Sequence, residues 1–341
     1  MNGTQSMDDS KILQATNIKK HFSAKKNFFG KSKNIVKAVD GVSLSINKGQ
    51  TFGIVGESGC GKTTLGRCLI RAIDPTSGEI KLTKNNGEEV NLESLNDSEL
   101  RAYRKYFQMI FQDPYSSLNP RLTVGEIIKE ALLYFDLDLK NIDDKVIEML
   151  KIVGLEDHHF HRYAHAFSGG QRQRIGIARA LIAQPDFIVC DESVSALDVS
   201  IQAQIINLLI ELQKKFHLTY LFISHDLSVV KYISDYIAVM YVGKIVEQGD
   251  KKIIFENPKH PYTHALLSSV PIPDPFKKKV RTILPGEPAN PTSIPLGCSF
   301  HPRCKFAKDK CKNEIPDLMK IDENHDVACH YADQIKLDKL F

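Results

Sequence analysis

Short apolar runs alternate with longer amphipathic stretches over most of the chain. The runs TFGIVG, FIVCDE and TYLFISH are rich in β-branched and aromatic residues, which is typical of buried strands. After Thr63, apolar side chains at Leu65, Cys68, Leu69 and Ala72 recur at helical spacing and predict a helix with one buried face, on which Cys68 is core packing. Strands and helices in this alternation predict an α/β fold with parallel strands joined by crossover helices.

Two changes in the pattern predict the domain organisation. From about residue 92 to 178 the strand-like runs give way to helical segments such as SELRAYRKYF, VGEIIKEALLYF and DDKVIEMLKIVG, which indicates a helical subdomain inserted into the α/β core. Seven of the 15 prolines then fall between residues 271 and 295, where no helix or central strand can continue. We therefore expect an α/β domain over 1–260 and a proline-rich linker with a small C-terminal domain over 261–341.

Composition excludes several classes of protein. With 42% hydrophobic and 25% charged residues the chain is ordinary globular material, and no stretch approaches the roughly 18 apolar residues of a membrane-spanning helix. We expect a chain that is neither secreted nor membrane-spanning. A net charge of +4 is too weak to indicate nucleic acid as a partner. A local basic run is interpreted as a solvated loop; it comprises Lys19, Lys20, Lys25, Lys26, Lys31, Lys33 and Lys37.

Residues 56–63 read GESGCGKT and match the phosphate-binding pattern G-x-x-x-x-G-K-[ST]. The strand before them and the helix after them disfavour a glycine turn that matches by chance. Glycines let backbone N–H groups surround phosphate oxygens, and the helix N-terminus adds partial positive charge. Lys62 is expected to reach the β- and γ-phosphates, and the Thr63 hydroxyl to bind Mg²⁺. The candidate nucleotide-binding residues of this loop are Gly56, Glu57, Ser58, Gly59, Cys60, Gly61, Lys62, Thr63 and Thr64.

An acidic pair follows the apolar run FIVC, which predicts that a buried strand delivers Asp191 and Glu192 to its carboxyl end. Open α/β sheets bind ligands at this edge. Asp191 is expected to hold Mg²⁺ through its water shell, and Glu192 to polarise the water that attacks the γ-phosphate. Cys190 is interpreted as buried packing. Taken alone, an apolar run that ends in two acids is a weak signal.

Residues 167–171 read FSGGQ and precede the helical sequence RQRIGIARALIAQ. Here the chain resembles the ATP-binding cassette (ABC) family, whose signature motif normally reads LSGGQ; Phe167 replaces the leucine. A serine hydroxyl and glycine N–H groups at a helix N-terminus suit an anion. The resemblance implies that this site binds the γ-phosphate of the ATP held by the opposite subunit. The matching residues are Ser168, Gly169, Gly170 and Gln171.

Further motifs extend the resemblance over about residues 12–258. Gln112 in FQDP is similar to the loop glutamine that senses Mg²⁺ and the membrane partner, His225 in FISHD to the switch histidine, and SALD at 195–198 to the dimer-contact loop. Phe22 in KKHF occupies the position of an aromatic that stacks on adenine. The resemblance therefore implies a P-loop ATPase with a catalytic set and a Mg²⁺ set. The catalytic set is Glu192, His225, Lys62 and Gln112, and the Mg²⁺ set is Thr63, Gln112 and Asp191.

Two positions depart from the family pattern. Ser193 stands where proline commonly follows the glutamate, and Cys60 occupies a variable position of the phosphate-binding loop. Neither removes a phosphate or metal ligand, so we expect an active site. A catalytically inactive regulatory cassette is disfavoured because Glu192 and His225 are present.

Longer segments resemble the oligopeptide and dipeptide importers, specifically the second of their two paired ATPase subunits, the oligopeptide-permease F type. NPKHPYTHALLSSVPIPDP and LPGEPANPTSIPLGCSFHPRC carry this assignment because they lie outside the general ATPase core. The resemblance implies peptide import, a related but non-identical ATPase partner, two transmembrane permease subunits, an external peptide-binding protein, and a peripheral location on the cytoplasmic face of the cell membrane.

Other functions remain as alternatives. Relatives of similar sequence move nickel or oligosaccharides. A soluble ABC ATPase acting on DNA or the ribosome is disfavoured, because the chain has neither the long coiled coils of the DNA-repair members nor a second cassette.

Four cysteines crowd into the last part of the chain, separated by five, six and seventeen residues. Without an export signal, disulfides are disfavoured. Four thiolates suit Zn²⁺ or an iron–sulfur cluster. The closely spaced pairs of zinc sites are missing, and peptide-importer relatives with a similar pattern carry a [4Fe–4S] cluster, so the resemblance favours the cluster, with Zn²⁺ as the alternative. A structural role is expected, because the proline-rich linker separates the cysteines from the ATP site. The candidate ligands are Cys298, Cys304, Cys311 and Cys329.

Overall fold

The structure, a computed structural model, describes residues 10–23, 35–135, 140–270 and 282–338. Part of the predicted basic run and part of the proline-rich linker lie outside the described residues, namely Lys25, Lys26, Lys31, Lys33, Pro271, Pro273 and Pro275. The described chain forms two compact units, one from 10–14, 44–50 and 79–222, the other from 15–43, 51–78 and 223–338. The long strands β1 (Lys11–Ser23) and β2 (Ile35–Asn47) have residues in both.

Buried strands form the centre of the first unit. β6 (Phe107–Ile110) pairs in parallel with β7 (Phe187–Asp191), and β8 (Thr219–Ile223) lies on the other side of β7. Every residue of β7 and β8 is buried, which explains why both read as continuous apolar runs. The prediction of strands at FIVCDE and TYLFISH is confirmed. β4 (Ser77–Thr83) pairs antiparallel with β5 (Glu89–Asn91).

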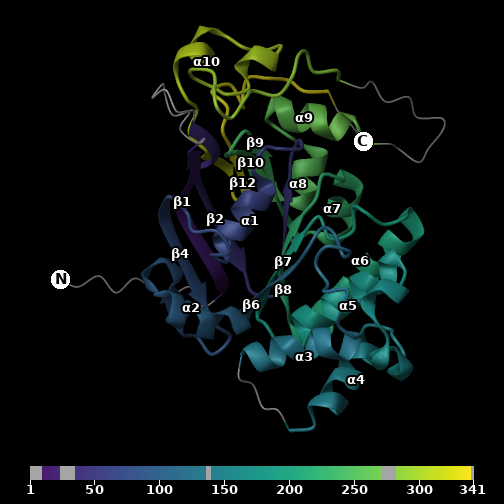
Figure 1. Cartoon of the computed structure of the whole chain (residues 1–341). Helices are drawn as coiled ribbons and strands as arrows, with labels where there is room; N and C mark the ends of the chain where they lie inside the picture. The colour runs from purple at the N-terminus through teal and green to yellow at the C-terminus, as the bar shows by residue number, and fades with distance from the viewer. Residues whose placement is uncertain (1–9, 24–34, 136–139, 271–281, 339–341) are drawn as a thin grey trace, which may run out of the picture. The chain divides into compact units, whose positions relative to one another are not determined.

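In the first unit, three helices pack against one another, as Figure 1 shows: α3 (Val124–Tyr134), α4 (Ile142–Ile152) and α5 (Gly169–Leu181). A capping box between Thr123 and Glu126 starts α3 and satisfies N–H groups that the helix itself leaves open. The other helices are α2 (Asp97–Tyr103), α6 (Val199–Phe216), and the short 3₁₀ turns η1 (Leu92–Ser94), η2 (Arg104–Tyr106), η3 (Asp157–His161) and η4 (Ala164–Ala166).

One strand within the predicted helical segment was missed. The expectation that SELRAYRKYF forms one helix was wrong at its end, because α2 stops at Tyr103 and β6 begins at Phe107. A run of four residues is too short to show a period of its own. Its pairing with β7 decides its conformation.

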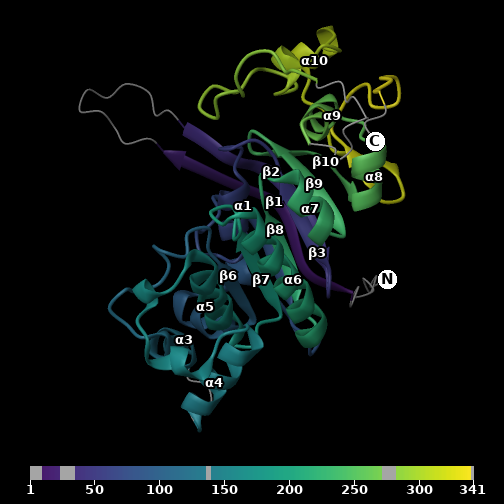
Figure 2. The same ribbon diagram turned by 90° about the vertical axis from the view of Figure 1, so that its right-hand side faces the viewer.

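The sheet of the second unit has the strand order β11-β12-β10-β9-β3. β3 and β9 are parallel, and the remaining neighbours are antiparallel. Figure 2 shows α8 beside β9 and β10. The strands are β3 (Thr51–Val55), β9 (Tyr236–Tyr241), β10 (Lys244–Asp250), β11 (Met319–Asp322) and β12 (His325–Val327). The helices are α1 (Lys62–Leu69), α7 (Leu227–Ile233), α8 (Lys251–Glu256), α9 (Pro261–Ser268), η5 (His301–Arg303) and α10 (Asp309–Asn313).

This sheet joins the segment that carries β3 with strands from the end of the chain. The predicted helix after the phosphate-binding loop is confirmed as α1, which buries Leu65, Cys68 and Leu69, whereas Ala72 lies beyond the helix and is exposed. None of the helices in the described ranges is long and apolar enough to span a bilayer.

A buried carboxylate holds the last strands of the sheet to the start of α9. Glu247 on β10 accepts hydrogen bonds from the backbone N–H groups of Lys259 (2.6 Å) and His260 (3.1 Å). The Nε2 atom of His325 lies 2.7 Å from Glu247 Oε1. These three partners supply hydrogen bonds to the fully buried carboxylate of Glu247. Without them, its removal from water would be costly.

Acid is expected to destabilise this part of the fold through His260, which is 2% exposed. Its Nδ1 atom accepts a hydrogen bond from the Tyr262 N–H at 3.1 Å, which requires the neutral ring. Burial lowers the pKa of His260 to about 4. Because the unfolded chain takes up this proton near pH 6.5, the free energy of unfolding should fall by about 2 kcal/mol between pH 7 and 5.

Urea denaturation at both pH values measures this loss. His260→Asn is the matched control, since asparagine can accept the same hydrogen bond without titrating in this range. Between pH 7 and 5, the free energy of unfolding of the His260→Asn protein should fall by about 2 kcal/mol less than that of the unmodified protein. Equal pH dependence in both proteins would contradict the role given to His260.

Candidate nucleotide-binding and hydrolytic site

The phosphate-binding loop of the second unit joins β3 to α1 in a backbone conformation that needs glycine. Gly56, Gly59 and Gly61 have φ angles of 154°, 77° and 106°. A Cβ atom on Gly56 would collide with the carbonyl oxygen of Met240, and one on Gly61 with that of Ala38. The first and sixth positions of the motif are therefore fixed by close backbone contacts with β9 and β2 as well as by φ.

Lys62 is buried inside the loop and is 4% exposed. Its ammonium donates to the carbonyl oxygens of Gly56 (2.8 Å) and Glu57 (3.0 Å). A cation enclosed by a glycine loop, in the first turn of a helix, is the arrangement that attracts phosphate. Cys60 is buried beside this ammonium, and burial raises the pKa of its thiol, which argues against a reactive thiolate.

Four further predicted residues of this unit lie on α1, on β1 and after β8. Thr63 and Thr64 are in the first turn of α1. Phe22, near the end of β1, is 39% exposed, and the Lys20 ammonium lies over its ring, 5.1 Å from the centroid. His225 follows β8 and is exposed, next to Asp226, which caps α7.

In the first unit, two predicted catalytic residues are in direct contact. The Gln112 amide donates to Glu192 Oε2 at 2.7 Å, so the structure brings the two side chains together. Asp191 is buried at the end of β7. Glu192 has a φ of 46°, which is uncommon for a residue with a side chain and typical of functional positions. Cys190 is fully buried and its pKa is raised by burial, which confirms its interpretation as core packing.

The predicted signature residues form the N-terminus of α5. The Ser168 hydroxyl accepts from the Gln171 N–H (3.3 Å), and the Ser168 N–H donates to the Gln171 side chain (3.1 Å). Gly169 and Gly170 follow as the first helical residues. A Cβ on Gly170 would lie 2.5 Å from Ile201 Cγ2 of α6, so packing fixes this glycine.

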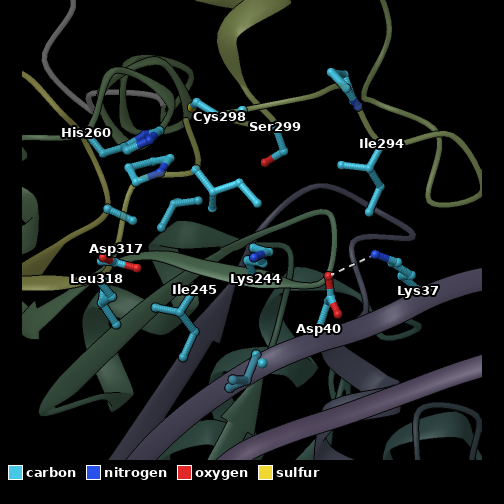
Figure 3. A pocket seen from close by; sticks show the side chains of 18 of the residues that line it. Lys37, Asp40, Lys244, Ile245, His260, Ile294, Cys298, Ser299, Asp317 and Leu318 are labelled. Atoms are coloured by element: carbon cyan, nitrogen blue, oxygen red, sulfur yellow. Dashed lines mark ion pairs between the residues drawn. The ribbon is translucent and has the colours of Figure 1, made fainter. Parts of the chain in front are cut away.

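A cavity of about 320 Å³ in the second unit lies between β2, β10 and the C-terminal segment (Figure 3). Lys37 and Asp40 form an ion pair of 3.6 Å at its wall, and Cys298 is part of its lining. Although burial raises the pKa of Asp40, a hydrogen bond with His21 and the charge of Lys37 bring it below its usual value. No residue of the phosphate-binding loop lines this cavity, so it is distinct from the candidate nucleotide site.

Residues that sequence reasoning missed contact the loop from the C-terminal segment. Arg303 donates to both carboxylate oxygens of Glu57, at 2.8 and 3.0 Å, and the Tyr262 hydroxyl accepts from the Glu57 N–H at 2.9 Å. The expectation that the proline-rich linker keeps this segment away from the loop was therefore wrong. No local signal could have revealed a pair separated by 246 positions.

Comparison with known proteins agrees with this geometry. Residues 39–195 match the ABC transporter family, and residues 246–311 match the oligopeptide/dipeptide transporter C-terminal region. The oligopeptide transport ATP-binding protein AppF of Bacillus subtilis is 51% identical over 323 residues, covering 94% of this chain and 97% of that protein. The chain belongs to the ABC transporter ATP-binding proteins. This membership confirms the predicted ABC cassette and ATPase.

This ABC protein is also similar to a second transport ATPase and to a solved cassette structure. The dipeptide transport ATP-binding protein DppF of Haemophilus influenzae is 46% identical, covering 96% of this chain and 98% of that protein. Among solved structures, a post-hydrolysis dimer of the ATP-binding cassette MJ0796 with ADP and Pi is 26% identical, with a TM-score of 0.61, covering 70% of this chain and 99% of that one. The cassette fold predicted from the motifs is confirmed.

The four C-terminal cysteines of this ABC protein do not form a ready-made metal site. Across the residues that the structure describes, no three His, Cys, Asp or Glu side chains lie close enough together to hold a metal ion. Burial raises the pKa of Cys298, Cys304 and Cys329 to about 11, with smaller contributions from neighbouring cysteines. The Cys298 N–H donates to the Cys311 carbonyl at 2.8 Å. The cysteines are neighbours, but the geometry does not support the predicted cluster or zinc ion.

Proposed function

We propose that this chain hydrolyses MgATP to drive import of oligopeptides or dipeptides across the cell membrane. The observation that carries the transport assignment is the match over 94% of the chain to a protein named for oligopeptide transport, which includes the region after residue 246. Nickel or an oligosaccharide remains an alternative cargo. The glycine loop with its enclosed Lys62, and the contact between Gln112 and Glu192, support the hydrolytic part.

The predicted catalytic and Mg²⁺-binding residues each have a role in this proposal. Lys62 exchanges the carbonyl oxygens of Gly56 and Glu57 for the β- and γ-phosphates, and Phe22 stacks on adenine. Glu192 accepts a proton from the water that attacks the γ-phosphorus, and His225 assists at the γ-phosphate. By the family resemblance, Thr63, Gln112 and Asp191 would hold Mg²⁺, which would neutralise phosphate charge. The products are ADP and inorganic phosphate.

The proposed partners follow from the family. A second, related ATPase supplies the opposite half of a closed dimer, in which the Ser168–Gln171 segment binds the γ-phosphate on the other subunit's nucleotide. Two permease subunits contact the surface around Gln112 and place the chain peripherally on the cytoplasmic side of the cell membrane. A peptide-binding protein outside the cell delivers the cargo. In this proposal residues 1–260 are the nucleotide-binding domain, with its helical subdomain at about 92–178, and 261–341 the C-terminal domain.

Transport by the purified complex tests this function. The chain, its partner ATPase and the permeases are reconstituted in liposomes with the external binding protein, and ATP-dependent uptake of labelled peptides, nickel and an oligosaccharide is compared. Peptide uptake that is lost in Glu192→Gln supports the proposal. Uptake of only nickel or the sugar would reassign the cargo, and copurification with ribosomes or DNA instead of permeases would overturn the transport role.

We also propose that the C-terminal cysteines bind a [4Fe–4S] cluster, with Zn²⁺ as the alternative. Support comes from the family resemblance and from four thiols in one short segment. To hold one metal centre, these thiols would have to move closer together than they lie in the described structure. The four thiolates would hold the centre and stabilise a segment with few apolar residues. Protein purified without oxygen should be brown, with about four iron and four sulfide per chain.

Metal content is compared with that of Cys304→Ser, which should lose most of the iron. Colourless protein with one zinc per chain would replace the cluster by zinc. Absence of both metals in the unmodified protein would contradict a metal centre.

A further inference from the structure

The phosphate-binding loop carries an acidic side chain at a place where ATP requires positive charge. Glu57 is the second residue of the loop, and its carbonyl oxygen accepts from the Lys62 ammonium. Its carboxylate is neutralised by Arg303, which binds both oxygens in the forked geometry that suits a guanidinium. The Arg303 side chain is 8% exposed and that of Glu57 is 26% exposed, so water screens this pair only partly.

Several contacts fix the position of Arg303. Its Nε donates to the Pro285 carbonyl at 3.3 Å, and its guanidinium carbon lies 6.0 Å from the ring centroid of Tyr241. Phe300, three residues earlier, packs against Tyr241 at 5.3 Å and Tyr262 at 5.4 Å between ring centroids. Tyr262 in turn accepts from the Glu57 N–H. The C-terminal segment therefore holds both the backbone and the side chain of Glu57.

We propose that Arg303 is a positioning residue of the ATP site, which neutralises Glu57 so that the loop presents net positive charge to the phosphates. This inference rests on the proposed ATP-binding function. Without Arg303 the Glu57 carboxylate would have no forked partner and would repel the phosphates of ATP. The C-terminal segment is thereby part of the nucleotide site, and Arg303 acts through Glu57 without touching ATP.

Nucleotide affinity of the full-length chain tests the proposal. Arg303→Met should weaken MgATP binding about tenfold in titration calorimetry, because an unpaired carboxylate then faces a highly charged ligand. High salt should shrink this difference. Glu57→Gln should bind MgATP a few-fold more tightly, since the Arg303 charge is left without its partner.

Two rescue variants separate this effect from a purely structural one. Arg303→Lys keeps the charge, and Glu57→Gln combined with Arg303→Met removes both charges; both should bind MgATP within about threefold of the unmodified chain. Melting temperatures are measured in parallel, and the Arg303→Lys and Glu57→Gln comparisons decide the matter if Arg303→Met does not fold.

Arg303→Met with unchanged affinity, or a double variant as weak as Arg303→Met, would overturn the proposal. So would an Arg303→Lys chain that binds as weakly as Arg303→Met at an unchanged melting temperature. Each of these outcomes counts against the role of Arg303 only if the unmodified chain binds MgATP. If the unmodified chain does not bind MgATP, the proposed ATP site itself is wrong.

Discussion

Glu192→Gln is expected to bind MgATP with nearly unchanged affinity and to hydrolyse it about 10²–10⁴-fold more slowly, the range for loss of a general base. The substitution keeps the size of the side chain and an oxygen that can accept the Gln112 amide, which lies 2.7 Å from Glu192 Oε2. What it removes is the ability to take a proton from the attacking water. Phosphate release under saturating MgATP, with the partner subunit present, measures the rate.

Glu211→Gln is the matched control for this variant. Glu211 is exposed on α6, the helix that follows the same strand and loop, so the same chemical change is made away from the proposed chemistry. It should hydrolyse ATP at the unmodified rate. A Glu192→Gln chain that keeps a rate within a factor of a few would show that another group activates the water.

The local part of the site could be predicted because each motif encodes its own geometry. Glycines at positions 56 and 61 have positive φ angles, which the motif itself encodes, and Ser168 with Gln171 forms a capping box whose three-residue spacing is visible in the sequence. Buried strands such as β7 are continuous apolar runs. These features depend on neighbours in sequence, so the sequence shows them.

Contacts between distant segments could not be predicted in the same way. The pairing that makes Phe107–Ile110 a strand comes from β7, and the ion pair at Glu57 comes from a residue 246 positions away. The run of prolines predicts a boundary, but it gives no information on which part of the protein the following segment contacts. In the sequence, Arg303 is a charged residue between a proline and a cysteine, and nothing near it indicates a contact with Glu57.

Lys62→Ala should weaken MgATP binding by about 10–100-fold, corresponding to loss of a charge-assisted contact worth 1.5–3 kcal/mol. Lys62 is the cation that the phosphate-binding loop encloses, and alanine leaves the carbonyl oxygens of Gly56 and Glu57 without their donor. The loop should therefore lose both its attraction for phosphate and part of its internal support, and the free energy of unfolding should fall by about 1–3 kcal/mol. Titration calorimetry and urea denaturation of the same preparations measure the two effects.

Lys81→Ala separates the specific loss from a general loss of positive charge. Lys81 lies on β4, where it forms a partly exposed ion pair with Glu89 at 3.2 Å, and ion pairs in contact with water contribute little to stability. The two variants have the same net charge, so long-range attraction of ATP is reduced equally in both. Lys81→Ala should bind MgATP within about twofold of the unmodified chain. Equal weakening in both variants would mean that Lys62 acts only through the overall charge of the protein, and unchanged binding in Lys62→Ala would remove the phosphate-binding role from this loop.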